Sequence, residues 1–295
     1  MSNANKLILG TVQFGLDYGI NNKTGKLKED DIFLVLEEAY KLGITTLDTA
    51  EAYGNAHEVI ARFHKQSNTR FNVISKFSSS VLDKYPKELN DRITHHCKEL
   101  DVLALEGYMF HSYIEFKNYI SQDLLILKKI KTLGLVNKIG VSVYTNIEIE
   151  DVLNYEEINL IQLPFNLFDN ELLRKDILQK AKMKGVEIHT RSSFLQGLFF
   201  KDISDLKGNL VNLEKDLNYL NELILENKIT KTSFTLNYPI SKEYIDKVVI
   251  GIDNISQLRD NIDVIKGFNS NSAFKQVDLI NIEHKELLNP SNWKL

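Results

Sequence analysis

Apolar residues along the chain fall into two kinds of segment that alternate from one end to the other. Short runs rich in Val, Ile and Leu predict buried strands, and segments with apolar residues three and four positions apart predict helices. The predicted strands are 7–9, 44–48, 71–75, one within 102–110, 138–143, 160–163, 186–190 and 247–251. The predicted helices are 29–42, 56–64, 85–99, 123–133, 148–153, 172–184, 213–226, 232–236 and 255–265.

The order of these segments predicts the fold class. Strands that alternate with helices are typical of a parallel α/β sheet, and no Pro/Gly/Ser-rich linker or fixed-period repeat interrupts the series. Eight strand–helix units in 295 residues predict one domain, residues 1–295, folded as a closed (β/α)8 TIM barrel. We expect the tail, 270–295, to pack on this barrel, with Trp293 in a surface groove or at the rim of the substrate site.

The composition and net charge argue against some classes of function, namely binding to nucleic acids and to membranes. The charged fraction of 26% and the hydrophobic fraction of 43% are ordinary for a globular protein. The net charge of -4 gives no footprint for nucleic acid or an anionic membrane surface. We expect neither a secretory leader nor a membrane span, since no apolar run approaches ~20 residues. The sequence predicts a cytoplasmic protein, a monomer or small homo-oligomer, that acts on a small molecule.

The single cysteine, Cys97, lies in a helical pattern beside His95 and His96. It has no partner for an internal disulfide, and we expect it to be a packing residue. Its spacing from the histidines matches no metal-ligand motif, so no metal is expected.

Polar residues stand where the predicted strands end. In a (β/α)8 barrel the carboxyl ends of the strands carry the active site. Asp48 ends the second strand, and Tyr53 follows it in a loop that also contains Gly54 and Asn55. The other polar or glycine positions at strand ends are Lys76, His111, Ser142, Gln162, Arg191 and Gly251.

Four of these residues form a coherent acid–base set. A phenol with a pKa near ~10 is a poor proton donor at neutral pH. An ammonium group about 4 Å away attracts the phenolate by about 4 kcal/mol before desolvation, which is up to ~3 pKa units. Lys76 would supply this ammonium, Asp48 would hold it charged, and His111 would orient the substrate oxygen. Such a set protonates a carbonyl oxygen while hydride reaches the carbon.

Each residue also has a structural alternative when taken singly. Asp48 could cap a helix or pair with a surface lysine, and Tyr53 could simply pack. Lys76 could reach solvent, and His111 could be a hydrogen-bonded loop residue. The functional interpretation is favoured because all of these alternatives would have to hold together.

The same residues belong to a series of motifs that resembles the aldo-keto reductase family from the first strand to the last helix. The motifs are Leu9-Gly10-Thr11 with Phe14-Gly15, Asp48-Thr49-Ala50 with Tyr53-Gly54, Lys76, His111, Gly140-Val141-Ser142, Gln162 with Asn166, and Gly251 with Gln257-Leu258 and Asn261. The resemblance implies a (β/α)8 barrel that reduces carbonyls reversibly with a nicotinamide cofactor. It also implies a catalytic tetrad of Asp48, Tyr53, Lys76 and His111, with Tyr53 as general acid.

The resemblance further implies the cofactor contacts. Ser142 and Gln162 match positions that hold the nicotinamide carboxamide. The last strand and helix bind the adenosine phosphate end, and a helix N-terminus with free N–H groups suits a phosphate. These positions are Gly251, Ile252, Asp253, Asn254, Gln257 and Asn261. The alternative for Gln257 and Asn261 is a solvated helix face.

Four positions depart from the family pattern. Val143 stands where many relatives have Asn, which removes one amide contact, and His57 stands where Glu is usual. Arg191 replaces an aromatic residue that stacks on the nicotinamide, so it would stack in its place, bind an anionic substrate group or form a salt bridge. Asp253 lies where NADP-preferring relatives carry a basic or small polar residue. Its carboxylate would repel a 2′-phosphate and could accept hydrogen bonds from a ribose diol. NADP is the family default, and NAD is possible.

Three functions are compatible with these features. The first is reduction of a small aldehyde, ketone or sugar. The second is a nicotinamide-binding sensor or regulatory barrel with little turnover. The third is a lyase or isomerase that uses Lys76 as a Schiff base. Substrate specificity is expected from the loops 13–25, 113–119 and 194–208 and from the tail after Gly267.

Overall fold

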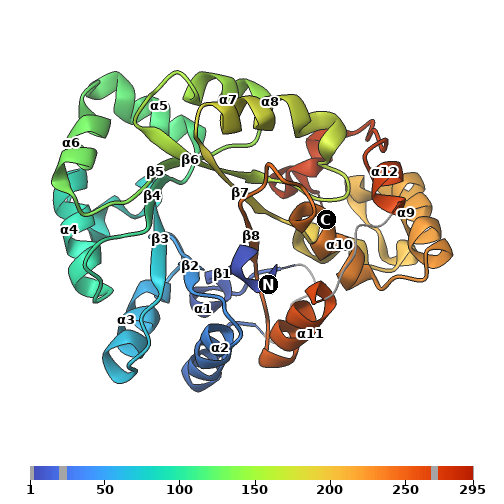
Figure 1. The fold of residues 1–295 in the computed structure, drawn as a ribbon, viewed down its shortest axis with the longest axis horizontal. Helices are drawn as coiled ribbons and strands as arrows, with labels where there is room; N and C mark the ends of the chain where they lie inside the picture. Colours follow the sequence, from blue (N-terminus) through green and yellow to red (C-terminus); the bar gives the residue numbers. More distant parts are fainter. Residues whose placement is uncertain (1–2, 20–24, 267–271, 295) are drawn as a thin grey trace.

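A computed structural model describes residues 3–19, 25–266 and 272–294. Eight parallel strands form a closed barrel in the order β1 to β8, and β8 pairs with β1 (Figure 1). This confirms the predicted (β/α)8 class. The strands are β1 Leu7–Gly10, β2 Thr46–Asp48, β3 Asn72–Phe77, β4 Gly107–Phe110, β5 Ile139–Ser142, β6 Ile158–Pro164, β7 Glu187–Arg191 and β8 Lys247–Ile250.

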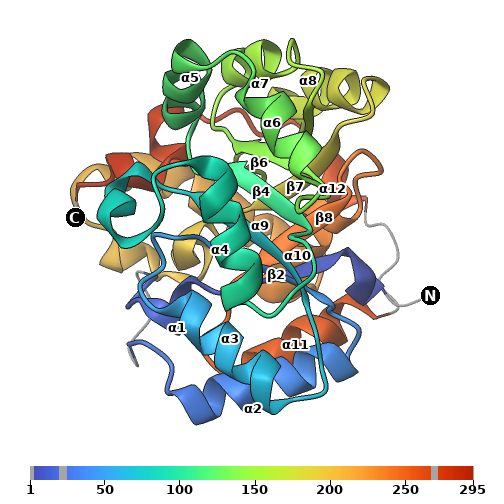
Figure 2. The ribbon, with the colours of Figure 1, turned by 90° about the vertical axis from the view of Figure 1, so that its left-hand side faces the viewer.

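Helices surround the strands on the outside (Figures 1 and 2). No helix of the described residues is both long and apolar enough to cross a membrane. The helices are α1 Val12–Gly15, α2 Glu29–Lys41, α3 Ala56–Gln66, α4 Leu89–Glu99, α5 Tyr113–Gln122, α6 Ile126–Leu133, α7 Asn146–Val152, α8 Glu171–Met183, α9 Glu214–Glu226, α10 Lys231–Ile240, α11 Ile255–Ile265 and α12 Ala273–Val277.

The alternation of side chains along the strands creates two separate cores. One set of buried apolar residues lies between the strands and the helices. A second, small cluster consists of Ile8, Ile74, Met109 and Leu160, with Val249 against it. Because residues two apart on a strand face the same side, Lys76 and Gln162 point into the barrel like Ile74 and Leu160, but nearer the carboxyl ends of the strands. Those positions hold polar side chains, which places chemistry at the mouth of the barrel.

Several predicted element boundaries were wrong for local reasons. The predicted loop 113–119 is helix α5, which Ser112 caps by accepting from the Glu115 amide, with Phe116 and Ile120 buried four positions apart. Helix α4 begins at Leu89 rather than Tyr85, because the residue before Pro86 is kept out of the helical region. The predicted loop 10–15 contains the short helix α1.

The C-terminal tail contacts several elements of the barrel. The Asn170 side-chain amide donates to the carbonyls of Val277 and Ile280, at 2.8 and 2.9 Å. Trp293 is partly buried against the main core, and its indole N–H donates to Leu287 O at 2.8 Å. Trp293 therefore packs against the protein rather than rimming the cavity described below. Parts of the predicted specificity segments, 20–24 and 267–271, lie outside the described residues.

Candidate active site

One cavity of about 550 Å³ opens at the carboxyl ends of the strands. It brings together eleven of the predicted site residues from both halves of the chain. These are Asp48, Tyr53, Lys76, His111, Ser142, Gln162, Arg191, Gly251, Asp253, Gln257 and Asn261. Of the remaining predicted residues, the Ile252 side chain is in the core, and Asn254 caps α11 by accepting from the Gln257 amide.

A buried ion pair forms the floor of this cavity. Lys76 Nζ lies 2.5 Å from Asp48 Oδ1 and also donates to the Thr49 carbonyl at 3.1 Å. Gln162 Nε2 donates to the second carboxylate oxygen of Asp48 at 2.8 Å. Lys76 is 1% exposed and Asp48 is 3% exposed. The lysine is therefore fixed by acceptors on two sides, as expected from the sequence.

Tyr53 is positioned by a close approach of two loops. A Cβ on Gly15 would lie 1.8 Å from the Tyr53 carbonyl oxygen, and Gly54 has a φ of +57°. Both positions therefore require glycine. The Tyr53 ring packs edge-on to His111, with centroids 5.7 Å apart, and Lys76 Nζ lies 5.3 Å from its centroid.

The expected depression of the Tyr53 pKa is wrong. Desolvation and the Asp48 carboxylate raise the pKa of Tyr53, although Arg191 opposes them. Desolvation also lowers the pKa of Lys76, against the opposing effect of Asp48. The largest cause is the removal of the Tyr53 phenol from water, which disfavours the charged phenolate, and the Asp48 carboxylate adds repulsion. Tyr53 therefore keeps its proton at neutral pH, as a general acid must.

His111 is held neutral by its surroundings. Desolvation and the Lys76 charge lower the pKa of His111 to about 4. A neutral imidazole offers one N–H donor and one acceptor nitrogen, so it can orient a carbonyl oxygen without carrying charge.

This pKa predicts a pH dependence of stability. Because the unfolded imidazole takes a proton near its ordinary pKa of 6.5 and the folded one near 4, the unfolded chain binds more protons between these values. Stability therefore falls as the pH drops through this window. At about pH 5 we expect a loss of up to about 2 kcal/mol relative to about pH 7 from this residue. Urea unfolding at both pH values should show a smaller loss for His111→Gln. Equal losses in the two proteins would contradict this assignment.

Arg191 stacks on an aromatic ring that was not predicted. Its guanidinium carbon lies 4.3 Å from the centroid of the Tyr144 ring, which also lines the cavity. Tyr144 follows Ser142 by two residues, so the strand period offered a signal for it. Residues after β7 depart from ordinary backbone geometry: Ser192, Leu195 and Gln196 have φ values of 61°, 44° and 51°. Ser192 and Gln196 line the cavity, and such strain is concentrated at functional sites.

The far end of the cavity has features that suit a dinucleotide. The first turn of α11 contributes Gln257, and the middle of the helix contributes Asn261, which is 5% exposed and so is not on a solvated face. A Cβ on Gly251 would lie 2.7 Å from Gln13 Nε2. Two polar atoms in the cavity wall, Gln13 Oε1 and Ser193 Oγ, are buried without a hydrogen-bond partner in the part of the chain that the structure describes. These two atoms could hydrogen-bond to the polar groups of a nicotinamide dinucleotide. Gly251 leaves room for a close approach, and the N-terminus of α11 suits a phosphate.

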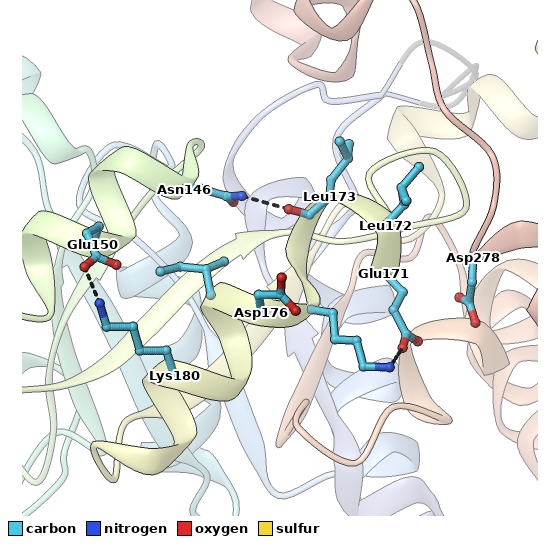
Figure 3. A pocket seen from close by; sticks show the side chains of 10 residues that line it. Asn146, Glu150, Glu171, Leu172, Leu173, Asp176, Lys180 and Asp278 are labelled. Atoms are coloured by element: carbon cyan, nitrogen blue, oxygen red, sulfur yellow. Dashed lines mark hydrogen bonds and ion pairs between the residues drawn. The ribbon is translucent and has the colours of Figure 1, made fainter.

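A second hollow, of about 620 Å³, lies on the outer surface beside α7 and α8 (Figure 3). Its charged side chains pair with one another: Lys180 with Glu150, and Lys175 with Glu171 at 2.6 Å. None of the predicted site residues lines it. The cavity at the strand ends is therefore the candidate active site.

The fold and the site together define a class of protein. It is a (β/α)8 barrel with a buried Asp–Lys pair, a tyrosine and a histidine at the carboxyl ends of its strands. The Aldo/keto reductase family matches residues 6–282. The chain belongs to this family.

Individual relatives are distant. NADH-specific methylglyoxal reductase of Escherichia coli (strain K12) is 22% identical over 55% of this chain and 56% of its own length. Probable aldo-keto reductase 1 of Glycine max is 27% identical over 65% of this chain and 60% of its own length. The matched part of the chain thus spans little more than half of these relatives. The holo structure of an aldo-keto reductase from Bacillus halodurans has a TM-score of 0.73 at 17% identity, over 92% of this chain and 90% of that chain.

Proposed function

We propose that this chain reduces the carbonyl group of a small molecule to an alcohol with NAD(P)H, and that Tyr53 donates the proton. One observation carries the proposal: a single cavity holds both the Asp48–Tyr53–Lys76–His111 set and the amino-terminal end of α11. Hydride donor and proton donor must meet at one carbonyl. A cavity that joins a dinucleotide-like site to an acid–base set meets this requirement.

Each residue has a distinct role in the proposal. Tyr53 holds its proton at neutral pH and gives it to the carbonyl oxygen. Lys76 places positive charge where that oxygen becomes negative, and Asp48 keeps Lys76 charged and oriented. His111, neutral through its low pKa, orients the carbonyl. The cofactor, when bound, supplies the hydride; Ser142, Gln162 and Arg191 would hold its nicotinamide end.

The wall around this set favours a polar substrate. Tyr18, Tyr144 and Phe194 present aromatic faces, and Arg191 adds a positive charge. Aromatic faces beside a guanidinium suit a hydroxylated or anionic carbonyl compound, such as a sugar.

The other two functions are weaker on physical grounds. A Schiff-base enzyme needs an amine that is free to attack the substrate carbonyl, whereas Lys76 Nζ is held by Asp48 and the Thr49 carbonyl. A sensor with little turnover does not need an acid–base set at the far end of its cofactor site.

The proposal is tested by titrating the protein with NADH and NADPH and then following their oxidation with a panel of aldehydes, ketones and open-chain sugars. Turnover with at least one carbonyl is expected. Cofactor binding with negligible turnover across the panel would favour the sensor. Absence of cofactor binding would refute both, and trapping of a carbonyl on Lys76 by borohydride would support the lyase.

Asp253 leads us to expect a preference for NADH. Among the described residues that line the cavity, Lys76 and Arg191 alone are cationic, and both belong to its catalytic end. Asp253 is the charged residue at the α11 end, where it would repel a 2′-phosphate. One relative is named an NADH-specific reductase, which agrees with this expectation. We expect the Kd for NADH to be at least about tenfold lower than for NADPH, equal to about 1.4 kcal/mol.

The substitution Asp253→Ser should reduce this ratio mainly by improving NADPH binding. Asp260→Ser is the matched control, because Asp260 is an exposed carboxylate on α11, the helix that follows Asp253, and does not line the cavity. Fluorescence titration of the three proteins gives the ratio. If Asp253→Ser and wild type discriminate equally, Asp253 lies away from the ribose.

A further inference from the structure

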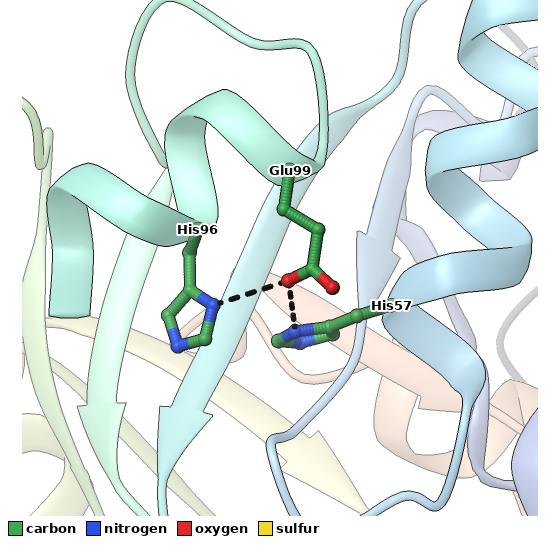
Figure 4. Close-up of side chains that lie close together, drawn as sticks. All are labelled: His57, His96 and Glu99. Atoms are coloured by element: carbon green, nitrogen blue, oxygen red, sulfur yellow. Dashed lines mark ion pairs between the residues drawn. The ribbon is translucent and has the colours of Figure 1, made fainter. Parts of the chain in front are cut away.

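Three ligand-type side chains meet on the outer side of the barrel, away from the cavity. His57 belongs to α3, and His96 and Glu99 belong to α4 (Figure 4). His57 and His96 are 1% and 0% exposed. Ser75, which alternates with the inward-facing Ile74 and Lys76 on β3, meets His57 from the strand side.

Among the described residues, the polar atoms at the centre of this group have no hydrogen-bond partner, although they face one another as ion pairs. They are His57 Nδ1, His96 Nδ1 and Glu99 Oε2, and all are buried. The three atoms lie within 4.8 Å of one another. Each histidine Nδ1 is 3.5 Å from Glu99 Oε2, which is longer than the ~2.7–3.2 Å of an N–H···O hydrogen bond. Burying polar atoms without hydrogen-bond partners destabilises the fold, so a ligand bound between these three atoms would be favourable.

The opposite nitrogen of each imidazole is already engaged. His96 Nε2 lies 2.8 Å from Glu51 Oε1, and Glu51 also receives hydrogen bonds from Tyr108 at 2.7 Å and Arg92 at 3.0 Å. Glu51 is therefore an ionised acceptor for His96 Nε2, and the other ring nitrogen, Nδ1, faces Glu99. His57 Nε2 lies 2.9 Å from Ser75 Oγ. A carboxylate or hydroxyl behind each imidazole is the usual support of a metal-binding histidine.

The charge of the group is also unbalanced. Glu51 is paired with Arg92. The Glu99 carboxylate ion-pairs only with histidines among the described residues: His57, His96 and, at 3.8 Å, the more exposed His95. No lysine or arginine of the described residues pairs with Glu99, so a bound cation would supply the full positive charge that its buried side lacks.

We propose that His57, His96 and Glu99 form a binding site for a divalent transition-metal ion such as Zn²⁺. Metal–ligand distances of about 2.0–2.1 Å place the ligands of a tetrahedral site about 3.4 Å apart, close to the two 3.5 Å separations observed. Two imidazoles and one carboxylate are a ligand set that zinc accepts. The Glu99 side chain is 18% exposed, so the group is in contact with solvent on that side.

Sequence spacing did not predict this site because its ligands come from two helices. The site uses His57, the position at which this chain departs from the glutamate usual in its family. The bound ion would tie α3 and α4 together behind β3, which is a structural role independent of the proposed reaction.

The test uses the full-length protein after treatment with a chelator. Calorimetric titration with Zn²⁺ should show one high-affinity site. Thermal unfolding with Zn²⁺ present should show a higher Tm. Co²⁺ should give the visible absorption of a tetrahedral complex. His57→Gln and Glu99→Gln should each weaken Zn²⁺ binding by at least about 100-fold. His284→Gln is the matched control, because exposed His284 also has its Nδ1 beside a glutamate, at 3.2 Å from Glu286.

Two results would overturn the proposal. One is the absence of stoichiometric binding to the wild type, which would mean that a shared proton satisfies Glu99 instead. The other is equal affinity of wild type, His57→Gln and Glu99→Gln. If circular dichroism shows that these variants do not fold, Ser75→Ala decides the question, with about tenfold weaker binding expected and unchanged affinity contradicting the site.

Discussion

Replacing Tyr53 with phenylalanine is expected to lower kcat by about 10²–10⁴-fold while cofactor affinity stays at the wild-type value. The substitution removes only the phenolic O–H. The ring would keep its edge-on contact with His111 and its place over Lys76, so the shape of the cavity is preserved. The lost rate corresponds to about 3–5 kcal/mol of transition-state stabilisation.

The measurement is steady-state kinetics with the best carbonyl of the panel, together with fluorescence titration of the cofactor. Tyr219→Phe provides the control, because Tyr219 is 45% exposed and lies outside the cavity. Residual activity close to that of Tyr219→Phe would mean that another group donates the proton. A loss of cofactor affinity without a loss of kcat would mean that Tyr53 serves binding rather than proton transfer.

The barrel could be predicted because each of its strands and helices has a sequence pattern of its own, and the strand–helix unit is repeated. Each strand is a short apolar run, and each helix has its own periodicity, so the alternation that defines the fold is visible without tertiary information. The positions of Asp48, Lys76 and His111 followed from the rule that strand ends carry the site. Once the strands close into a barrel, these three residues line one cavity.

What the sequence could not supply depends on distances between elements. The direction of the Tyr53 pKa shift was misjudged because it depends on how completely the phenol is buried and on its distance from the Asp48 carboxylate. The stacking of Tyr144 on Arg191 joins β7 to the segment after β5, and no spacing along the chain encodes it. The same holds for the histidine–glutamate group behind β3, whose members come from two different helices.

The buried Asp48–Lys76 pair leads to the second large effect, on stability. Asp48→Asn leaves a lysine that is 1% exposed without its counter-charge, and Lys76→Met leaves a carboxylate that retains only the Gln162 amide as a side-chain donor. Each single variant should lose about 3–5 kcal/mol of unfolding free energy, because an uncompensated charge remains buried. The double variant removes both charges and should recover much of this loss. All three variants should lack activity, because the reaction needs the charge of Lys76.

Urea unfolding of the four proteins of this cycle measures the coupling between the two residues. The matched control is the same pair of substitutions at Asp263 and Lys266, a pair 2.9 Å apart whose side chains are 70% and 53% exposed. Its coupling should stay below about 1 kcal/mol. If the losses at Asp48 and Lys76 simply add in the double variant, the two groups do not share a buried ion pair. If instead the double variant is stable and active, the charge of Lys76 is dispensable for catalysis and the proposed role of the pair fails. A stable, inactive double variant would show that this chain keeps a costly buried charge for its chemistry rather than for its fold.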